Sequence, residues 1–96
     1  MNKSELVDSI AEKSGLTKRD ADRALQATVD SVMEAMCCND KVSLVGFGSF
    51  EVRYRKERAG RNPATGEPMT IAASYVPAFR PSKTMKEEVN KSLNAE

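Results

Sequence analysis

The feature that most constrains this 96-residue chain is a strand-like alternation that continues after its apolar face has ended. From Ser49, apolar Phe50, Val52 and Tyr54 take every second position, and charged residues stand between them. Beyond Tyr54 the polar pattern runs on through Arg58 without a further apolar partner. Ten residues of strand span about 33 Å, more than a core of this size needs. The sequence therefore predicts that this segment leaves the body of the protein and is held by a second strand returning beside it.

The returning strand is predicted from residue 69 to residue 76. Residues 59–68 lie between the two strands and contain two glycines and two prolines, which is typical of a turn-rich tip. A short strand is predicted over residues 41–45, followed by a turn at 46–48 that its two glycines permit. Together these segments predict a small sheet from which a two-stranded ribbon projects.

Helices are predicted before and after the strands. Asn2 can cap the first with Glu5 at its third helical position, and Gly15 supplies a left-handed stop. Thr17, answered by Asp20, can cap a second helix that ends near residues 38–40. This pair also resembles a helix-turn-helix, but a major-groove role is disfavoured because the outward face of the second helix is acidic. Its apolar stripe recurs at three- and four-residue steps through Ala21, Ala24, Leu25, Thr28, Val29, Val32, Met33 and Met36.

A third helix is predicted after Ser82, which can serve as its N-cap, with Met85, Val89 and Leu93 as an apolar stripe. Lys83 and Lys86 stand near its start, where the helix dipole does not favour cations. Cations at such a position suggest an external anion.

The charge is unevenly distributed although the net charge is only +1. Residues 1–40 carry −3, residues 41–86 carry +6 and residues 87–96 carry −2. An acidic half followed by a basic half points to a polyanionic partner. The absence of histidine excludes Ser-His-Asp and Cys-His catalysis and most zinc sites, and no nucleophile or phosphate loop replaces them. We therefore expect no enzymatic activity and no cofactor.

Compartment and redox state follow from a few further features. The adjacent Cys37 and Cys38 cannot build a disulfide framework and are expected to be free thiols without an assigned role. No apolar run reaches the length needed to cross a bilayer, and the N-terminus lacks the apolar stretch of a signal peptide. We therefore expect a cytoplasmic protein without a membrane partner.

Three motifs in order resemble those of the bacterial histone-like HU and integration host factor family, and the resemblance covers almost the whole chain. They are Gly46-Phe47-Gly48-Ser49-Phe50, Gly60-Arg61-Asn62-Pro63-x-Thr65-Gly66 and Pro77-Ala78-Phe79-Arg80-Pro81-x-Lys83. The resemblance implies an α+β fold in one domain that forms an intertwined dimer. Residues 1–40 would be the helical dimerisation part, residues 41–82 the sheet with an arm at about 53–76, and residues 83–94 the last helix.

The function implied by the resemblance is architectural. Two β-ribbon arms would embrace double-stranded DNA in the minor groove with little sequence specificity, Pro63 would intercalate and kink it, and the nucleoid would be compacted. The DNA-binding residues implied are Lys3, Arg53, Arg55, Arg58, Arg61, Asn62, Pro63, Arg80, Lys83 and Lys86. The predicted homodimer core consists of Val29, Val32, Met36, Phe47, Phe50 and Phe79, because these exceed what one thin core can bury.

Some features depart from the family pattern. Ser82 stands where a glycine is usual, Glu67 adds an anion to the tip, and the returning strand from Met69 to Tyr75 carries no cation. These departures predict weaker and more salt-sensitive binding than a strongly basic relative would show. Nicked, bent or junction DNA are further candidate ligands, and the sequence leaves open whether RNA also binds. One alternative is a sequence-selective subunit of an integration-host-factor-like heterodimer. Another is an interaction module whose ribbon pairs with a foreign sheet edge.

Overall fold

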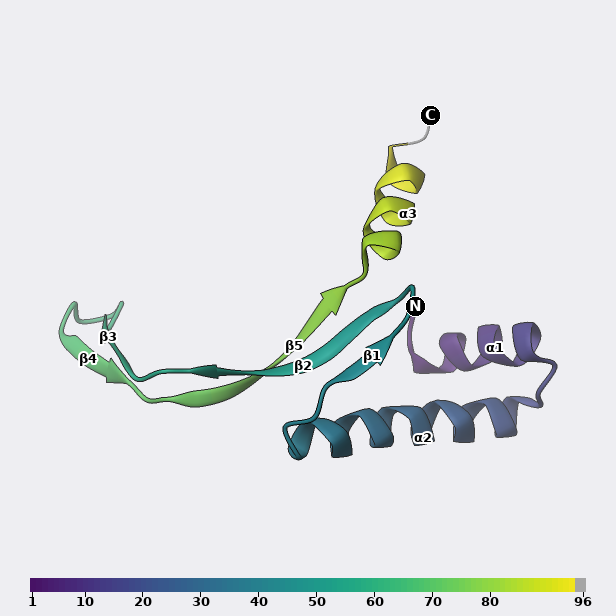
Figure 1. Ribbon diagram of the computed structural model, residues 1–96, viewed down its shortest axis with the longest axis horizontal. Helices are drawn as coiled ribbons and strands as arrows, with labels where there is room; N and C mark the ends of the chain where they lie inside the picture. Colours follow the sequence, from purple (N-terminus) through teal and green to yellow (C-terminus); the bar gives the residue numbers. More distant parts are fainter. Residues whose placement is uncertain (95–96) are drawn as a thin grey trace. The chain divides into compact units, whose positions relative to one another are not determined.

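The structure is a computed structural model that describes residues 1–94, and it confirms the predicted α+β fold. Two helices precede five strands and a last helix follows them (Figure 1). The elements are α1 (Lys3–Ser14), α2 (Lys18–Cys37), β1 (Val42–Leu44), β2 (Gly48–Arg55), β3 (Arg58–Arg61), β4 (Pro68–Ile71), β5 (Ser74–Pro81) and α3 (Lys83–Leu93). The chain divides into two compact units, Met1–Ala35 and a second that begins at Met36. The finer division predicted above, with an arm at residues 53–76, stays a prediction.

The predicted helix ends are confirmed because local capping determines them. The Asn2 side chain accepts a hydrogen bond from the Glu5 amide at 2.9 Å, and Gly15 ends α1 with φ 76°. The Thr17 hydroxyl accepts from the Asp20 amide at 3.1 Å at the start of α2. No helix in the described part of the chain is long and apolar enough to span a membrane.

The strands form a three-stranded antiparallel sheet, ordered β1-β2-β5, and a separate two-stranded sheet, β3-β4. Within the first, Phe50 pairs with Phe79 and Tyr54 with Tyr75. Because side chains alternate between faces, one face of β2 carries Phe50, Val52 and Tyr54, and the other carries charge. The predicted alternation is confirmed over this strand.

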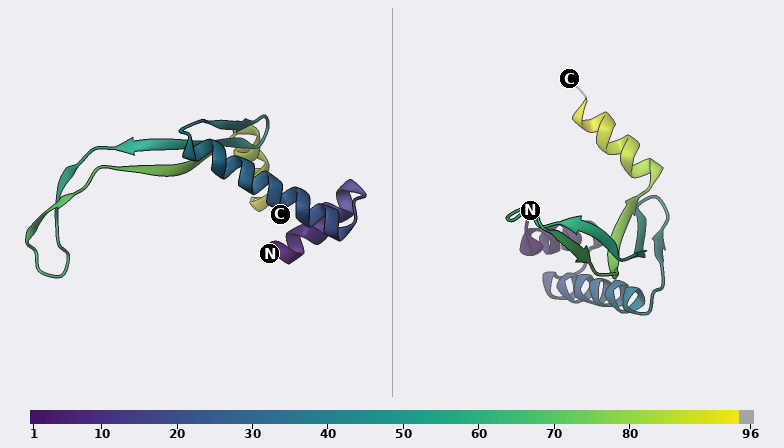
Figure 2. Two further views of the ribbon diagram at one scale, coloured as in Figure 1. Left: turned by 90° about the horizontal axis from the view of Figure 1, so that it is seen from below. Right: turned by 90° about the vertical axis from the view of Figure 1, so that its left-hand side faces the viewer.

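The predicted continuous strand from Ser49 to Arg58 is wrong at its far end. The ladder stops at Arg55 and resumes at Arg58, so Lys56 and Glu57 lie between β2 and β3. On the returning side, two residues, 72 and 73, are also left between β4 and β5. Equal gaps preserve the register, and the strands still run beside one another to the tip (Figure 2, left). The interruption coincides with residues of low β-propensity, namely Lys, Glu and two alanines.

The predicted tip at residues 59–68 is also too long. Residues 59–61 belong to β3, where Ala59 pairs with Thr70 and Gly60 with Met69. The glycine suggested a turn, but Gly60 lies within the strand, where an added Cβ would approach the flexible end of the Ile71 side chain at 2.9 Å. The turn itself is confined to the residues between Arg61 and Pro68.

The interior of the described chain is thin. Val7 and Ala21 are its only buried apolar residues, and no large side chain is fully buried. Phe47, Phe50 and Phe79 cluster where the start of β2 lies beside the end of β5, with ring centroids 4.9 to 6.4 Å apart. Phe79 is nevertheless 39% exposed. The aromatic cluster is therefore assembled but not covered by its own chain.

Gly48 makes the close approach between β2 and the Phe79 ring possible. A Cβ on Gly48 would lie 2.6 Å from Phe79 Cζ and 2.6 Å from the Arg80 carbonyl oxygen. Because moving the backbone away from the added methyl is energetically costly, we expect Gly48→Ala to lower the free energy of unfolding by about 1–3 kcal/mol. Urea denaturation measures this change. Gly60→Ala is the matched control, because its added methyl would meet side-chain atoms of Ile71 and Met69 and no backbone atom among its nearest neighbours. Equal losses in the two variants would contradict this packing.

Candidate nucleic-acid interface

The charged face of the sheet gathers three of the predicted DNA-binding arginines. Arg53 and Arg55 alternate with Glu51 along β2, and Arg80 lies on β5 directly opposite Ser49. Strand alternation places all of them on the face opposite to the phenylalanines. The structure thus brings Arg53, Arg55 and Arg80 onto one surface.

Glu51 lies among these cations and partly neutralises them. Its Oε1 accepts from Arg53 Nη2 at 2.9 Å and from Arg53 Nε at 3.2 Å. The hydrogen bonds and charge of Arg53, together with the charges of Arg80 and Lys41, hold the pKa of Glu51 below its usual value despite an opposing desolvation effect. The carboxylate is therefore ionised at neutral pH, and Arg53 must exchange this partner before it can bind a phosphate. Lys41, which the sequence interpretation did not select, belongs to this cluster.

The distal half of the arm carries Arg58 and Arg61 at the two ends of β3, opposite Ile71 and Pro68. Arg61 Nη1 donates to the Gly66 carbonyl at 3.2 Å, which holds the guanidinium at the tip. Both side chains are exposed. They extend the row of cations along the arm toward its end.

At the tip, Asn62 braces the turn around Pro63. The Asn62 Oδ1 accepts from the Ala64 amide at 2.9 Å, its amide donates to the Glu67 carbonyl, and its carbonyl accepts from the Gly66 amide at 2.7 Å. Pro63 is exposed at the apex. Asn62 therefore uses its side-chain oxygen to hold the turn, a role that the sequence interpretation did not foresee when it counted this residue among the DNA contacts.

The start of α3 holds the second group of cations. The Ser82 hydroxyl caps the helix by accepting from the Met85 amide at 3.0 Å, so serine serves well where the family pattern has glycine. The first turn has no acidic residue, while Lys83 lies 3.9 Å from Glu87 one turn later. Lys86 is exposed on the same helix. This arrangement favours an anion approaching from outside.

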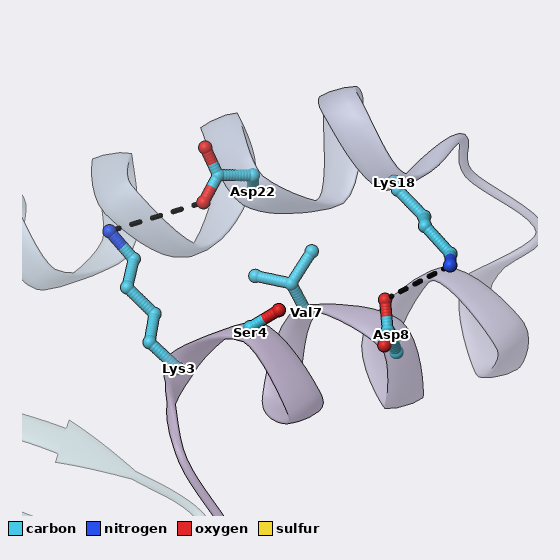
Figure 3. A pocket seen from close by; sticks show the side chains of 6 residues that line it. All are labelled: Lys3, Ser4, Val7, Asp8, Lys18 and Asp22. Carbon is cyan, nitrogen blue, oxygen red and sulfur yellow. Dashed lines mark ion pairs between the residues drawn. The ribbon is translucent and has the colours of Figure 1, made fainter.

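Lys3 belongs to the other unit and is held by residues of α2. Its Nζ donates to Gln26 Oε1 at 2.8 Å and lies 3.9 Å from Asp22 (Figure 3). A second ion pair, Lys18 to Asp8 at 3.4 Å, bridges the same two helices at the far end of a hollow of about 460 Å³. Exposed pairs of this kind stabilise by less than about 1 kcal/mol, so Lys3 can exchange its partner for a phosphate at little cost.

Within residues 1–94, no group of three His, Cys, Asp or Glu residues could hold a metal ion. Cys37 and Cys38 are free and exposed, as predicted. The sequence interpretation did not identify one further pair: the register of β2 and β5 places Tyr54 opposite Tyr75, with ring centroids 5.2 Å apart.

The comparisons with known proteins agree with this arrangement. The family model described as "Bacterial DNA-binding protein" matches residues 1–90. DNA-binding protein HU of Geobacillus stearothermophilus is 57% identical over 93% of this chain and 99% of its own. Among solved structures, an Anabaena HU–DNA cocrystal structure shares 55% identity with a TM-score of 0.86, covering 93% of this chain and 97% of the other. HU from Thermotoga maritima shares 36% identity with a TM-score of 0.67, covering 93% and 98%.

Proposed function

Because this chain belongs to the bacterial HU family of DNA-binding proteins, we propose that it binds double-stranded DNA in the minor groove and kinks it with Pro63. The observation that carries this proposal is the apex of the arm. Pro63 is exposed at the end of an in-register ribbon. The side chain of the neighbouring Asn62 braces the turn by accepting a hydrogen bond from the Ala64 amide. A rigid apolar ring without an N–H can enter a base step without desolvating a donor.

The free energy lost when the wedge opens a base step must be offset by contacts with the DNA on either side of the kink. Unstacking one base step costs a few kcal/mol, and wedges of this kind kink duplexes by about 20–90°. The cations of the arm and of the α3 start supply attraction to the flanking phosphates, which carries no sequence information. Arg61 lies nearest to the wedge, and its planar fork can meet the acceptors of A·T pairs. We therefore infer weak sequence preference, with some selectivity for flexible or already bent DNA.

The protein acts as a homodimer in this proposal. The aromatic cluster is incompletely covered, and so are Val29 of α2 and Val89 and Leu93 of α3. Exposed apolar surface of this extent marks an interface. A second copy of the chain would cover these side chains by isologous contact and would supply a second arm. Two arms that bend DNA in succession would compact the nucleoid.

A salt titration tests the binding mode. If five to nine phosphates are neutralised per dimer, the logarithm of the duplex affinity should fall with the logarithm of salt concentration at a slope of roughly −4.5 to −8. Fluorescence anisotropy with a labelled duplex measures this slope. Because Arg53 is already paired with Glu51, we expect Arg53→Gln to flatten it less than Arg58→Gln does.

Two outcomes would contradict the proposal. A flat salt dependence would mean that phosphates are not the ligand, as in an interaction module that pairs sheet edges. Strong selectivity among unrelated duplexes at one salt concentration would instead indicate a sequence-reading protein.

A further inference from the structure

Cys37 and Cys38 place two thiols on adjacent residues at the C-terminal end of α2. They are the only cysteines in the sequence, and both are free and exposed. Cys37 is the last residue of the helix, and Cys38 lies in the turn that follows. This turn is closed by the Asn39 amide, which donates to the Met36 carbonyl at 2.9 Å, and Asn39 has a left-handed φ of 57°. The end of the helix therefore presents two neighbouring thiols to solvent.

Two adjacent thiols can bind one metal ion together. The Cα atoms of neighbouring residues are about 3.8 Å apart, and exposed side chains are free to change rotamer. Rotation about the two χ1 bonds can therefore direct both sulfur atoms toward the same ion. Once one sulfur is bound, the second bond forms within the molecule, which raises the affinity above that of a single thiol.

The two thiols lie outside the apolar surface that the proposed dimer covers. Of the predicted dimer core residues, only Met36 adjoins them in sequence, and neither cysteine is a member of that core. The chain continues from Cys38 through Asn39, Asp40 and Lys41, which are all polar and exposed. The thiols therefore belong to a polar turn at the edge of the covered surface.

The electrostatic surroundings of the thiols admit a cation. The C-terminal end of a helix carries partial negative charge, and the last turn of α2 contains no basic side chain. The two ionic residues that follow, Asp40 and Lys41, have opposite charges. A metal cation that approaches the thiols therefore meets no net repulsion.

The number of available ligands determines which ion fits. The described part of the chain, residues 1–94, holds no cluster of three His, Cys, Asp or Glu side chains that could coordinate a metal. Protein zinc sites use three or four such ligands, and iron–sulfur clusters use four, so two thiols do not suffice for either. Soft thiolate ligands also select monovalent copper, which is satisfied by two sulfur atoms in a linear arrangement. An isolated pair of thiols therefore fits Cu(I).

We propose that Cys37 and Cys38 form a binding site for one Cu(I) ion per chain, coordinated by both sulfur atoms. Each thiol releases its proton to solvent as its sulfur binds the ion, so the bound form is a bis-thiolate complex. No electron is transferred in this step. The site uses none of the residues proposed to contact DNA, and it stands independently of the function proposed above.

Thiol titration tests whether the assembled protein leaves this site open. A chromogenic disulfide reagent should react with both cysteines of each chain in the native wild-type protein, at a concentration at which the protein is dimeric. If either thiol reacted only after denaturant was added, the proposal would be overturned, because the fold or the second copy would cover the site.

Competition with a coloured Cu(I) chelator such as bicinchoninate measures binding. Under anaerobic conditions with ascorbate, the wild type should withdraw one Cu(I) per chain from the chelator. The single variants Cys37→Ser and Cys38→Ser should each bind at least about 100-fold more weakly, because the intramolecular second bond is lost. Wild-type affinity in either single variant would contradict the proposal. Displacement of Cu(I) by an equal amount of Zn(II) would also contradict it, since zinc requires further ligands.

Alkylation provides a control that needs no substitution. Wild-type protein treated with iodoacetamide has no free thiol and should leave all the copper with the chelator. Its affinity for duplex DNA should stay unchanged, because neither thiol is among the proposed DNA contacts, and this measurement checks that the treated protein is folded. Copper binding that survives alkylation would show that other groups hold the ion, and the proposal would be wrong.

Discussion

Replacing Pro63 by alanine should remove most of the DNA bend while lowering duplex affinity by less than about tenfold. Alanine at the apex lacks the ring that fills an opened base step, so the step stays stacked and the kink is lost. The variant also avoids the cost of unstacking, and the cations of the arm and of α3 remain, so attachment persists. Energy transfer between dyes at the two ends of a short duplex measures the bend, and anisotropy on the same duplex measures affinity.

Pro68→Ala is the matched control for this experiment. Pro68 lies in β4 opposite Arg61, behind the apex, so its replacement removes a proline from the arm without touching the wedge. We expect this variant to bend DNA as the wild type does. Equal bending by wild type and Pro63→Ala would show that the apex does not act as a wedge.

Replacing Phe79 by alanine should destabilise the protein by about 3–5 kcal/mol, because this ring is the centre of the aromatic cluster. It contacts both other members, with centroid distances of 4.9 Å to Phe50 and 5.3 Å to Phe47. If a second copy covers the cluster, the substitution weakens the association of the dimer as much as it destabilises the fold of each protomer. We therefore expect the melting temperature of the wild type to rise with protein concentration. At equal concentration, the melting temperature of Phe79→Ala should lie well below that of the wild type.

Phe79→Leu provides the control, since a leucine fills much of the same space and should cost far less. Sedimentation at decreasing concentration checks the coupling to assembly. A wild-type chain that stays folded as a monomer on dilution would contradict the obligate dimer.

The parts of the fold that depend on local interactions could be predicted from the sequence. Asn2, Thr17 and Ser82 each cap a helix through a hydrogen bond to an amide three residues later, a pattern visible in the residues themselves. The alternation from Phe50 to Tyr54 likewise determines which face of β2 is apolar. Such signals are contained within one segment and need no partner.

The features that were missed depend on a second segment. The interruption after Arg55 occurs at the same level on both strands, so the pattern of one strand could not show it. Gly60 was assigned to the turn because its fit beneath Ile71 becomes visible only in the paired ribbon. The same holds for the Tyr54–Tyr75 pair, which depends on strand register.

The candidate site shows the same division. The sequence could supply the cations and the exposed proline, but not the environment of each charge. Arg53 is paired with Glu51, and Lys3 is held by Gln26 and Asp22. These contacts depend on side-chain geometry at exposed positions, where sequence patterning is weak.

Ring closure tests the central claim most directly. A linear duplex well below the persistence length of about 150 base pairs rarely closes on ligation because bending it is costly. With the wild-type protein bound at low salt, we expect circular products to increase strongly, as two arms kink each bound duplex. If anisotropy shows the duplex to be saturated while the yield of circles stays at that of free DNA, the protein binds without bending, and the account is wrong.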